Sequence, residues 1–398
     1  MMKEQTLELY VHIPFCKKKC RYCDFLSFAG EEWTQETYTQ ALIREIGAWR
    51  GKENKKVSSV FVGGGTPSIL SVRRMEEIFE ALRESFFLAE DAEITIECNP
   101  GTLEKEKLEV YKCLGVNRLS LGLQSAKNEE LRLLGRIHTW ETFLESFQMA
   151  RKAGFENLNV DLISALPGQT VESWRETLEK AIALSPEHIS AYSLIIEEGT
   201  PFWNRFGEGA CACDYTGPAL PDEDTENKIY RFTRKFLQEQ GFERYEISNY
   251  AKPGKECRHN IGYWTEVAYL GLGLGASSYM EGCRFTNEKD LDKYLALDFG
   301  EEDPEKRETA LRKLWGQIEE LSQAQRMEEF MFLGLRMLKG VSDVDFVRLF
   351  GVKMETVYGD VIRRLTANGL LKKEENNLAL TEWGMDVSNF VLSEFLLG

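Results

Sequence analysis

The first 250 residues alternate short apolar segments with longer amphipathic ones, a pattern typical of strands followed by helices. The pattern predicts strands at residues 7–13, 58–62, 94–97, 118–123, 158–163 and 188–195. It predicts helices at residues 34–49, 72–87, 104–114, 139–153, 171–184 and 222–240. Repeated strand–helix units form a parallel sheet covered by helices. The sequence therefore predicts an α/β fold.

Polar residues, glycine and proline gather directly after the predicted strands. Besides Pro14 and the cysteines that follow it, these segments are 63–67, 97–100, 124–125, 161–168 and 197–201. The carboxyl ends of parallel strands are where barrels and doubly wound sheets bind their ligands. We therefore expect a partial, TIM-like (β/α)₆ barrel with a binding site at that edge.

The pattern changes at residues 301–306, an acidic stretch that contains Pro304. Helical patterns follow at residues 326–339, 342–350 and 354–368, and then two short strands and a final helix. Helices followed by a two-stranded ribbon resemble a winged-helix-like domain. We expect residues 1–300 to form the barrel with its site, and residues 301–398 to form a small C-terminal accessory domain.

Composition narrows the class of protein. The 398 residues carry a formal net charge of −16, which argues against nucleic-acid binding, including by a regulatory C-terminal module. No apolar stretch approaches the roughly 20 residues that span a bilayer. The start of the chain lacks the layout of a signal peptide. Nine cysteines, an odd number in no regular frame, favour a reducing, cytoplasmic environment.

Three cysteines form a C-x₃-C-x₂-C run directly after the first predicted strand: Cys16, Cys20 and Cys23. Thiolates at this spacing can bind three irons of a [4Fe–4S] cluster and leave the fourth iron open to a ligand. A structural zinc site is the weaker reading, because it needs a second pair of ligands that this run lacks. A disulfide is disfavoured in a chain without a secretory signal.

The cysteine run, with Tyr22 before its third cysteine, resembles the radical S-adenosylmethionine (SAM) superfamily. Over nearly the whole chain the resemblance is to its branch of oxygen-independent coproporphyrinogen III oxidases (HemN) and HemW-type haem chaperones. It implies a radical SAM barrel that holds [4Fe–4S] and SAM, with a HemN-like accessory domain after it. The implied chemistry is electron transfer from the cluster into SAM, which yields methionine and a 5′-deoxyadenosyl radical able to abstract hydrogen.

The resemblance also implies the cofactor-binding residues. They are Tyr10, Tyr22, Gly64, Gly65, Thr66, Glu97, Gln124, Arg136 and Asp161. In the oxidases, the positions of Gly65, Thr66, Gln124, Arg136 and Asp161 resemble contacts to a second SAM, and whether a chaperone-type member binds one stays open. Without the resemblance, the glycines would also fit a tight turn, and the strand-end polar residues would fit helix caps.

Two features separate the branches. The oxidases carry another cysteine two residues after the third, and here that position is Phe25. Residues 259–264, His-Asn-Ile-Gly-Tyr-Trp, match the H-N-x-x-Y-W signature of the chaperone branch. An imidazole is a good haem-iron ligand, so His259 is the predicted haem contact, with Cys257 as a rival.

The first hypothesis is therefore a haem chaperone that binds the cluster, SAM and haem. By resemblance its partners are haem-acceptor proteins of the respiratory chain, with transient peripheral association with the membrane or dimerisation. The alternative is an enzyme of porphyrin biosynthesis, oxygen-independent oxidative decarboxylation of coproporphyrinogen III. Phe25 in place of the oxidases' additional cysteine disfavours this activity, and whether a radical reaction turns over stays open.

Overall fold

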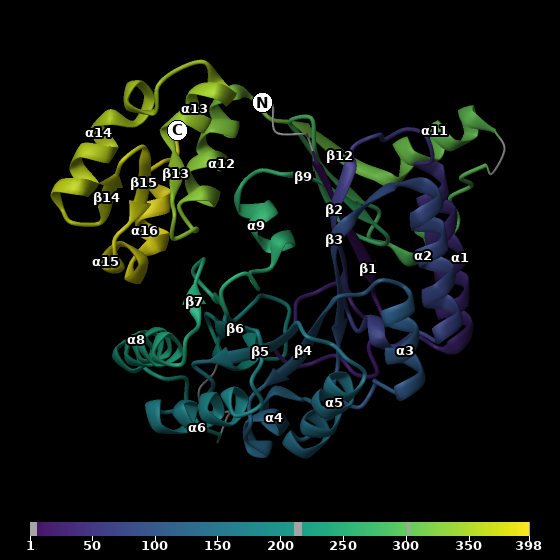
Figure 1. The fold of residues 1–398 in the computed structure, drawn as a ribbon, viewed down its shortest axis with the longest axis horizontal. Coiled ribbons are helices and arrows are strands. Elements are labelled where there is room, and N and C mark those ends of the chain that lie inside the picture. Colours follow the sequence, from purple (N-terminus) through teal and green to yellow (C-terminus); the bar gives the residue numbers. More distant parts are fainter. Residues whose placement is uncertain (1–5, 211–216, 301–302, 398) are drawn as a thin grey trace.

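The computed structural model describes residues 6–210, 217–300 and 303–397, and it has an α/β fold with one twelve-stranded sheet (Figure 1). Strands β1 to β6 lie side by side in chain order, and all of their pairings are parallel. Helices connect them and cover the outer face of the sheet (Figure 1). The predicted α/β class, with consecutive parallel strands, is confirmed.

The parallel strands are β1 Thr6–Ile13, β2 Lys56–Gly64, β3 Phe87–Cys98, β4 Arg118–Gln124, β5 Leu158–Ser164 and β6 His188–Ser193. The helices among and after them are α1 Glu32–Ala48, η1 Pro67–Ile69, α2 Val72–Ser85, α3 Lys105–Cys113, α4 Asn128–Leu134, α5 Trp140–Lys152, α6 Val171–Ile182, α7 Trp203–Phe206 and α8 Glu223–Glu239. Strand β3 begins at Phe87 rather than residue 94, because Phe87 and Leu88 also pair with β2 before an irregularity in the register.

The sheet continues past the predicted strands on both sides. The additional strands are β7 Glu243–Arg244, β8 Asn249–Ala251, β9 Ala268–Leu272, β10 Ser277–Met280, β11 Cys283–Asn287 and β12 Trp315–Glu320. The helices in this part are α9 Arg258–Trp264, α10 Leu291–Leu295 and α11 Pro304–Leu314. Strand β9 pairs parallel to β1, and the others add antiparallel edges. These strands lie outside the strand–helix repeat from which the other strands were predicted, so the sequence did not predict them.

The parallel strands alternate apolar and polar side chains, and both sets are buried. In β1, Leu7 and Leu9 belong to the hydrophobic core, whereas Glu8 points the other way and is also buried. The same alternation puts Arg118 of β4 and His188 of β6 among the buried polar residues. The apolar halves of the strands therefore pack under the helices, and the polar halves line the concave interior of the barrel.

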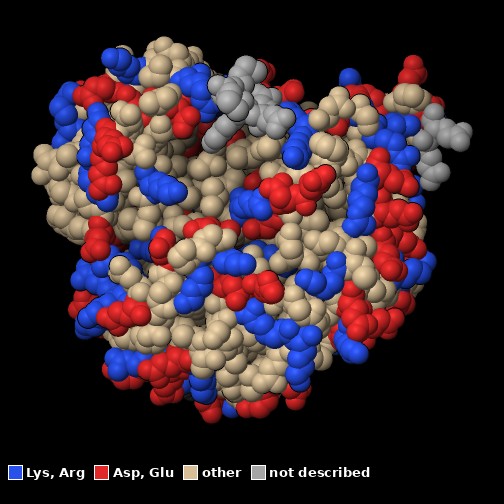
Figure 2. All heavy atoms as spheres, in the orientation of Figure 1, with Lys and Arg blue, Asp and Glu red and all other residues tan. Residues whose placement is uncertain are grey.

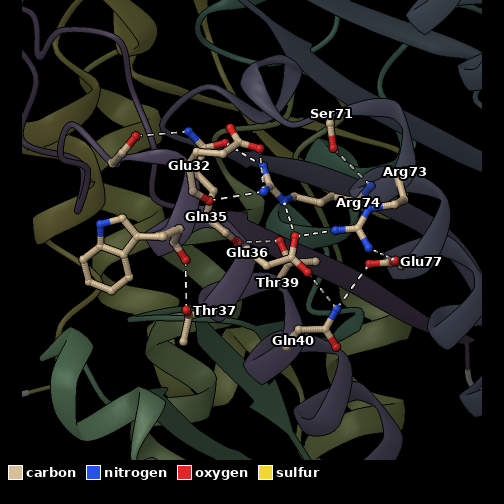
Figure 3. Close-up of polar contacts among 12 residues, drawn as sticks. Glu32, Gln35, Glu36, Thr37, Thr39, Gln40, Ser71, Arg73, Arg74 and Glu77 are labelled. Carbon is tan, nitrogen blue, oxygen red and sulfur yellow. Dashed lines mark hydrogen bonds and ion pairs between the residues drawn. The ribbon is translucent and has the colours of Figure 1, made fainter.

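Helices α1 and α2 are joined by a buried arginine (Figure 3). Arg74 of α2 donates from Nε to Glu36 at 3.0 Å, from Nη2 to Glu32 at 2.7 Å and from Nη1 to the amide oxygen of Gln35 at 3.3 Å. Its side chain is only 4% exposed. The three partners satisfy a guanidinium that would otherwise be costly to bury.

The C-terminal part has its own core. Its elements are α12 Gln323–Gly334, β13 Val341–Ser342, α13 Asp343–Phe350, α14 Met354–Ala367, β14 Leu371–Glu374, β15 Asn377–Leu380, α15 Glu382–Asp386 and α16 Ser388–Ser393. The predicted two-stranded ribbon is β14–β15, which β13 extends to three strands. Strand β12 lies beyond residue 300 but belongs to the large sheet. We therefore propose that the two parts divide at Glu320 and not at residue 300.

Acidic and basic side chains are interspersed over the face of the molecule seen in Figure 2. Neither sign gathers into one broad field there, although the chain as a whole carries an excess of 16 acidic charges. A uniformly charged face, of the kind that would attract a polyanion, is not present on the side that the figure draws.

Candidate functional site

The three cysteines lie in the segment that follows β1, at the carboxyl edge of the parallel strands. Cys16, Cys20 and Cys23 are partly exposed free thiols, and all three line one cavity of about 380 Å³. Backbone hydrogen bonds hold this segment in place, from Cys16 N to Phe28 O at 2.9 Å and from Arg21 N to Leu134 O at 2.9 Å. The turn after the strand thus presents three sulfurs to one space.

The donor set fits an iron–sulfur cluster. Among the residues that the structure describes, no three His, Cys, Asp or Glu side chains are grouped to hold a single metal ion. A cubane cluster binds each thiolate at a different iron, so its ligands need not converge on one point. Burial raises the pKa of the Cys23 thiol to about 11 in the protein alone, and metal binding would remove that proton.

The opposite wall of the cavity comes from the ends of successive strands. The predicted residues of this wall are Gly64, Gly65, Glu97, Gln124 and Asp161; the cavity is also lined by Tyr22 of the cysteine segment and by Arg136, which follows α4. Gly64 is the last residue of β2 and Gly65 follows it, and Glu97 and Gln124 lie at the ends of β3 and β4. Because the strands are parallel and adjacent, residues distant in sequence meet at one edge.

Arg136 connects the cysteine segment to the sheet. Its Nη1 lies 3.6 Å from the Sγ of Cys20, and its Nη2 donates to Asn99 and, at 2.8 Å, to the carbonyl of Gly122. The same Asn99 donates to Thr66 Oγ1 at 2.6 Å. Arg136 is partly buried, and its guanidinium beside sulfur ligands offsets the negative charge that thiolates bring.

Two carboxyl groups face the cavity from β3 and β5. Burial, with the nearby Asp161 carboxyl adding to it, raises the pKa of Glu97 to about 8, although the backbone N–H of Gly64 donates to Glu97 at 3.0 Å. Burial also raises the pKa of Asp161, against the hydrogen bonds that it accepts from Ser120 and Asn159. A ligand with an ammonium group or hydroxyls would favour their ionised forms.

Tyr10 and Thr66 do not line this cavity, but both support it. The Tyr10 hydroxyl lies 3.0 Å from His12 Nδ1, and His12 Nε2 donates to the carbonyl of Leu26 at 2.9 Å, just after the third cysteine. Thr66 Oγ1 lies 3.5 Å from the Sγ of Cys16. Their predicted contacts with a cofactor remain predictions, and their contacts in the protein hold the cysteine segment.

His259 lies elsewhere, toward the amino ends of the strands. It is 1% exposed, with Nδ1 2.8 Å from Ser59 Oγ and Nε2 3.1 Å from the Tyr263 hydroxyl, and its ring stacks on Phe61. Burial lowers the pKa of His259 to about 3 and raises the pKa of the neighbouring Glu8 to about 9. Both side chains are therefore neutral, and they do not form an ion pair. The rival ligand Cys257 is also fully buried. Haem iron would reach His259 only if these contacts opened.

Several residues of the cavity wall were not predicted from the sequence. They are Asn99, Ser120, Gly122, Tyr192, Leu194 and Ile195. Tyr192 lies in β6, whereas Leu194 and Ile195 lie after it, because β6 stops at Ser193, before the predicted end at residue 195. Asn99 sat within the polar segment 97–100, so its position after a strand was the signal that could have identified it.

Comparisons with known proteins agree with this arrangement. The pattern of the Radical SAM superfamily matches residues 10–181, and that of the HemN C-terminal domain matches residues 321–387. The chain is 37% identical to Heme chaperone HemW of Lactococcus lactis subsp. lactis (strain IL1403), covering 100% of this chain and 99% of that protein. It is 34% identical to Heme chaperone HemW of Bacillus subtilis (strain 168), covering 97% and 98%.

A solved structure has the same fold over almost the full length. It is coproporphyrinogen III oxidase (HemN) from Escherichia coli, described as a radical SAM enzyme, with a TM-score of 0.82 and 25% sequence identity. The match covers 99% of this chain and 91% of that one. The fold of this chain, including its C-terminal part, is therefore shared with that structure.

Proposed function

Because this chain belongs to the HemW family of heme chaperones in the radical SAM superfamily, we propose that it binds a [4Fe–4S] cluster, SAM and haem, and transfers haem to acceptor proteins. The observation that carries the proposal is the single cavity that gathers Cys16, Cys20 and Cys23 against the polar ends of the parallel strands. The cluster and SAM, when bound, supply one-electron chemistry. The residues that line the cavity bind and orient these cofactors.

The cofactor-binding wall offers complementary groups for an amino acid joined to a nucleoside. Glu97 and Asp161 provide carboxyls for an ammonium group or ribose hydroxyls, and the partly buried Arg136 provides a cation for a carboxylate. Gly64 and Gly65 expose backbone to the cavity without a side chain in between. These features support SAM as the ligand of this wall.

The mouth of the cavity suits the apolar face of a haem. Phe25 and Ile195 line it while being 61% and 66% exposed, and Tyr192 lies on the same lining. Lys18 and Lys19 are exposed lysines in that lining, and they complement the propionates of a porphyrin. An exposed apolar rim with adjacent cations supports docking of a flat, apolar and doubly acidic ligand.

His259 remains the alternative haem contact, proposed from the family signature. It lies near the amino ends of β1 and β2, whereas the rim lies beyond their carboxyl ends, so a single haem cannot occupy both. Contact at His259 would require α9 to move away from Ser59. Because the residues of the rim are exposed and His259 is buried, the rim is the favoured haem site.

Haem-acceptor proteins are the proposed partners. Transient association with a membrane surface and dimerisation are part of the same proposal. Among the described residues, no helix is long and apolar enough to cross a membrane.

The test is anaerobic reconstitution of the cluster, followed by haem titration and a coproporphyrinogen decarboxylation assay on the same sample. We expect haem binding without decarboxylation at an enzyme-like rate. Ile195→Asp should weaken haem binding, and the matched change Ile318→Asp, at another exposed isoleucine on β12, should not. His259→Ala should alter the haem spectrum only if that residue ligates iron.

The outcomes separate the candidates. Absence of haem binding in the parent protein would overturn the chaperone function. Rapid decarboxylation would favour the second candidate, an oxidase, which the overall likeness to the E. coli HemN structure supports. Equal haem affinity in Ile195→Asp and Ile318→Asp, with a changed spectrum in His259→Ala, would move the haem site from the rim to α9.

A further inference from the structure

A chain of hydrogen bonds crosses the interior of the barrel below the cofactor cavity. Tyr245, in the β7–β8 hairpin, has its hydroxyl 2.9 Å from His188 Nε2. His188 Nδ1 lies 2.6 Å from the side-chain oxygen of Asn159, and Asn159 Nδ2 lies 2.7 Å from Asp161 Oδ1. The chain thus joins a residue outside the cavity to a carboxyl group on its wall.

The neighbours of these groups fix the direction of every bond in the chain. Asn159 Nδ2 must donate, because it also lies 2.7 Å from Ser120 Oγ, which itself donates to Asp161. Asn159 Oδ1 then accepts from His188 Nδ1. Burial lowers the pKa of His188 far below its usual value, so the ring is neutral and Nε2 accepts from Tyr245. All donors therefore point toward Asp161.

Strand register explains why the chain is possible. Asn159 of β5 pairs directly with His188 of β6 and with Ser120 of β4. Asn159 and Asp161 are two residues apart on the same strand, so both point into the interior. The chain is therefore held by the parallel sheet itself, with no flexible loop between Asp161 and His188.

The other end of the chain lies where the two parts of the molecule meet. The backbone carbonyl of Tyr245 accepts a hydrogen bond from Leu338 N at 3.0 Å, and Glu246 forms an antiparallel bridge with Met337. Tyr245 and Met337 also share an apolar cluster with Cys257, which directly precedes α9. The position of the tyrosine is thus set by the docked segment after α12.

We infer that Asn159, His188 and Tyr245 are positioning residues for Asp161, and that through them the docked segment Arg336–Leu338 influences the SAM affinity of the cavity. The inference rests on the proposed function, in which Asp161 contacts SAM. Asp161 accepts hydrogen bonds from Ser120 and Asn159, and the Ser190 hydroxyl also interacts with it, so the carboxyl is held in one rotamer on the wall of the cavity.

Removing the Tyr245 hydroxyl, the first donor of the chain, should change the SAM affinity of the cavity. In Tyr245→Phe, His188 Nε2 loses its donor, and the histidine is free to change tautomer and stop donating to Asn159. We expect SAM affinity to fall about three- to tenfold, the effect of one hydrogen bond. The matched control is Tyr111→Phe, at a buried tyrosine whose hydroxyl has no hydrogen-bond partner among the described residues; its SAM affinity should equal the parent's.

The test is a double-mutant cycle on the full chain with the cluster reconstituted. SAM affinity is measured by equilibrium titration for Tyr245→Phe, Asp161→Asn and the double variant. If the tyrosine acts through Asp161, its substitution should have no further effect in the Asp161→Asn background. A tyrosine that only stabilises the fold would lower affinity equally in both backgrounds, which would overturn the inference.

A second pair of variants guards against loss of folding. His188→Gln keeps one donor and one acceptor and should retain most of the SAM affinity, whereas His188→Leu keeps neither and should lose it. Equal affinities in these two variants, at matched thermal stability, would contradict a relay through His188.

A separate test addresses the proposed influence of segment Arg336–Leu338 on SAM affinity. Met337→Ala should weaken SAM in the parent but not in Tyr245→Phe, and unchanged SAM affinity alongside a lowered thermal midpoint would overturn it. If Asp161→Asn itself leaves SAM affinity unchanged, the proposed role of Asp161 fails. If Asp161→Asn weakens SAM and Tyr245→Phe does not, only the inference fails.

Discussion

Replacing Gly64 by alanine measures how tightly the glycine turn after β2 is packed. Gly64 has φ +109°, in the region that side chains rarely adopt. A Cβ atom built there would lie 2.5 Å from the Cε1 and Nδ1 atoms of the His12 ring. His12 is not free to move, because it is hydrogen-bonded to Tyr10 and to the carbonyl of Leu26.

The expected loss in the free energy of unfolding of Gly64→Ala has two parts. Forcing an alanine into the left-handed region costs about 1–2 kcal/mol. Overpacking against a held ring costs roughly another 1–3 kcal/mol. Gly51→Ala is the matched control, since Gly51 has φ +76° and no atom within 4 Å of the built Cβ. The free energy of unfolding should therefore fall more in Gly64→Ala than in Gly51→Ala, by the second part alone.

The assay is urea unfolding of the reduced protein without its cluster, with the free energy taken from midpoints at equal slope. Adding His12→Ala should relieve the contact, so the double variant should lose little more than the backbone cost when it is compared with His12→Ala alone. Iron content after reconstitution is a second readout, because His12 anchors Leu26 behind the cysteine segment. Equal losses in Gly64→Ala and Gly51→Ala would refute the packing argument, and the turn would then need glycine for its backbone only.

Three further predictions concern the cluster, a buried acid and the helix pair. Cys20→Ser should abolish iron–sulfur absorption and iron content, whereas Cys113→Ser, at an exposed cysteine on α3, should leave both unchanged. Burial raises the pKa of Glu8 to about 9 from 4.5, so its cost to stability is absent below pH 4.5 and complete above pH 9. Glu8→Gln should therefore stabilise the protein increasingly with pH in chemical unfolding, and a constant difference between the two curves would contradict this. Arg74→Leu should lower the free energy of unfolding by about 1–3 kcal/mol, and Arg73→Leu, at a side chain 62% exposed, should lower it less.

Much of the fold followed from the sequence because the parallel strands are regular. Each of β1 to β6 has a core-facing apolar set and a helix after it, so strand order and the ligand-binding edge could be predicted. The short strands β7 to β12 could not, since segments such as Glu243–Arg244 are paired by tertiary contacts and carry no periodic signal.

Site residues at the ends of strands could be predicted from the sequence. Residues whose role depends on whether their side chains are buried could not. The cysteines and Glu97 could be located because they occur at fixed places after strands. His259 could not be placed, because a sequence motif does not tell whether an imidazole faces solvent or a network such as Ser59 and Tyr263. Asn159 and His188 gave no signal at all, since a polar residue in an alternating strand is ordinarily expected to face water.

The position of β1 in the sheet has a consequence for how the protein is made. One edge of β1 pairs with β2, and the other pairs with β9, whose residues 268–272 leave the ribosome much later. Until then, β1 is an open edge strand, and joining such distant segments is slow. We expect chains truncated before Ala268 to aggregate through that edge. We also expect cluster insertion to follow the pairing of β9 with β1, because the cysteine segment depends on β1.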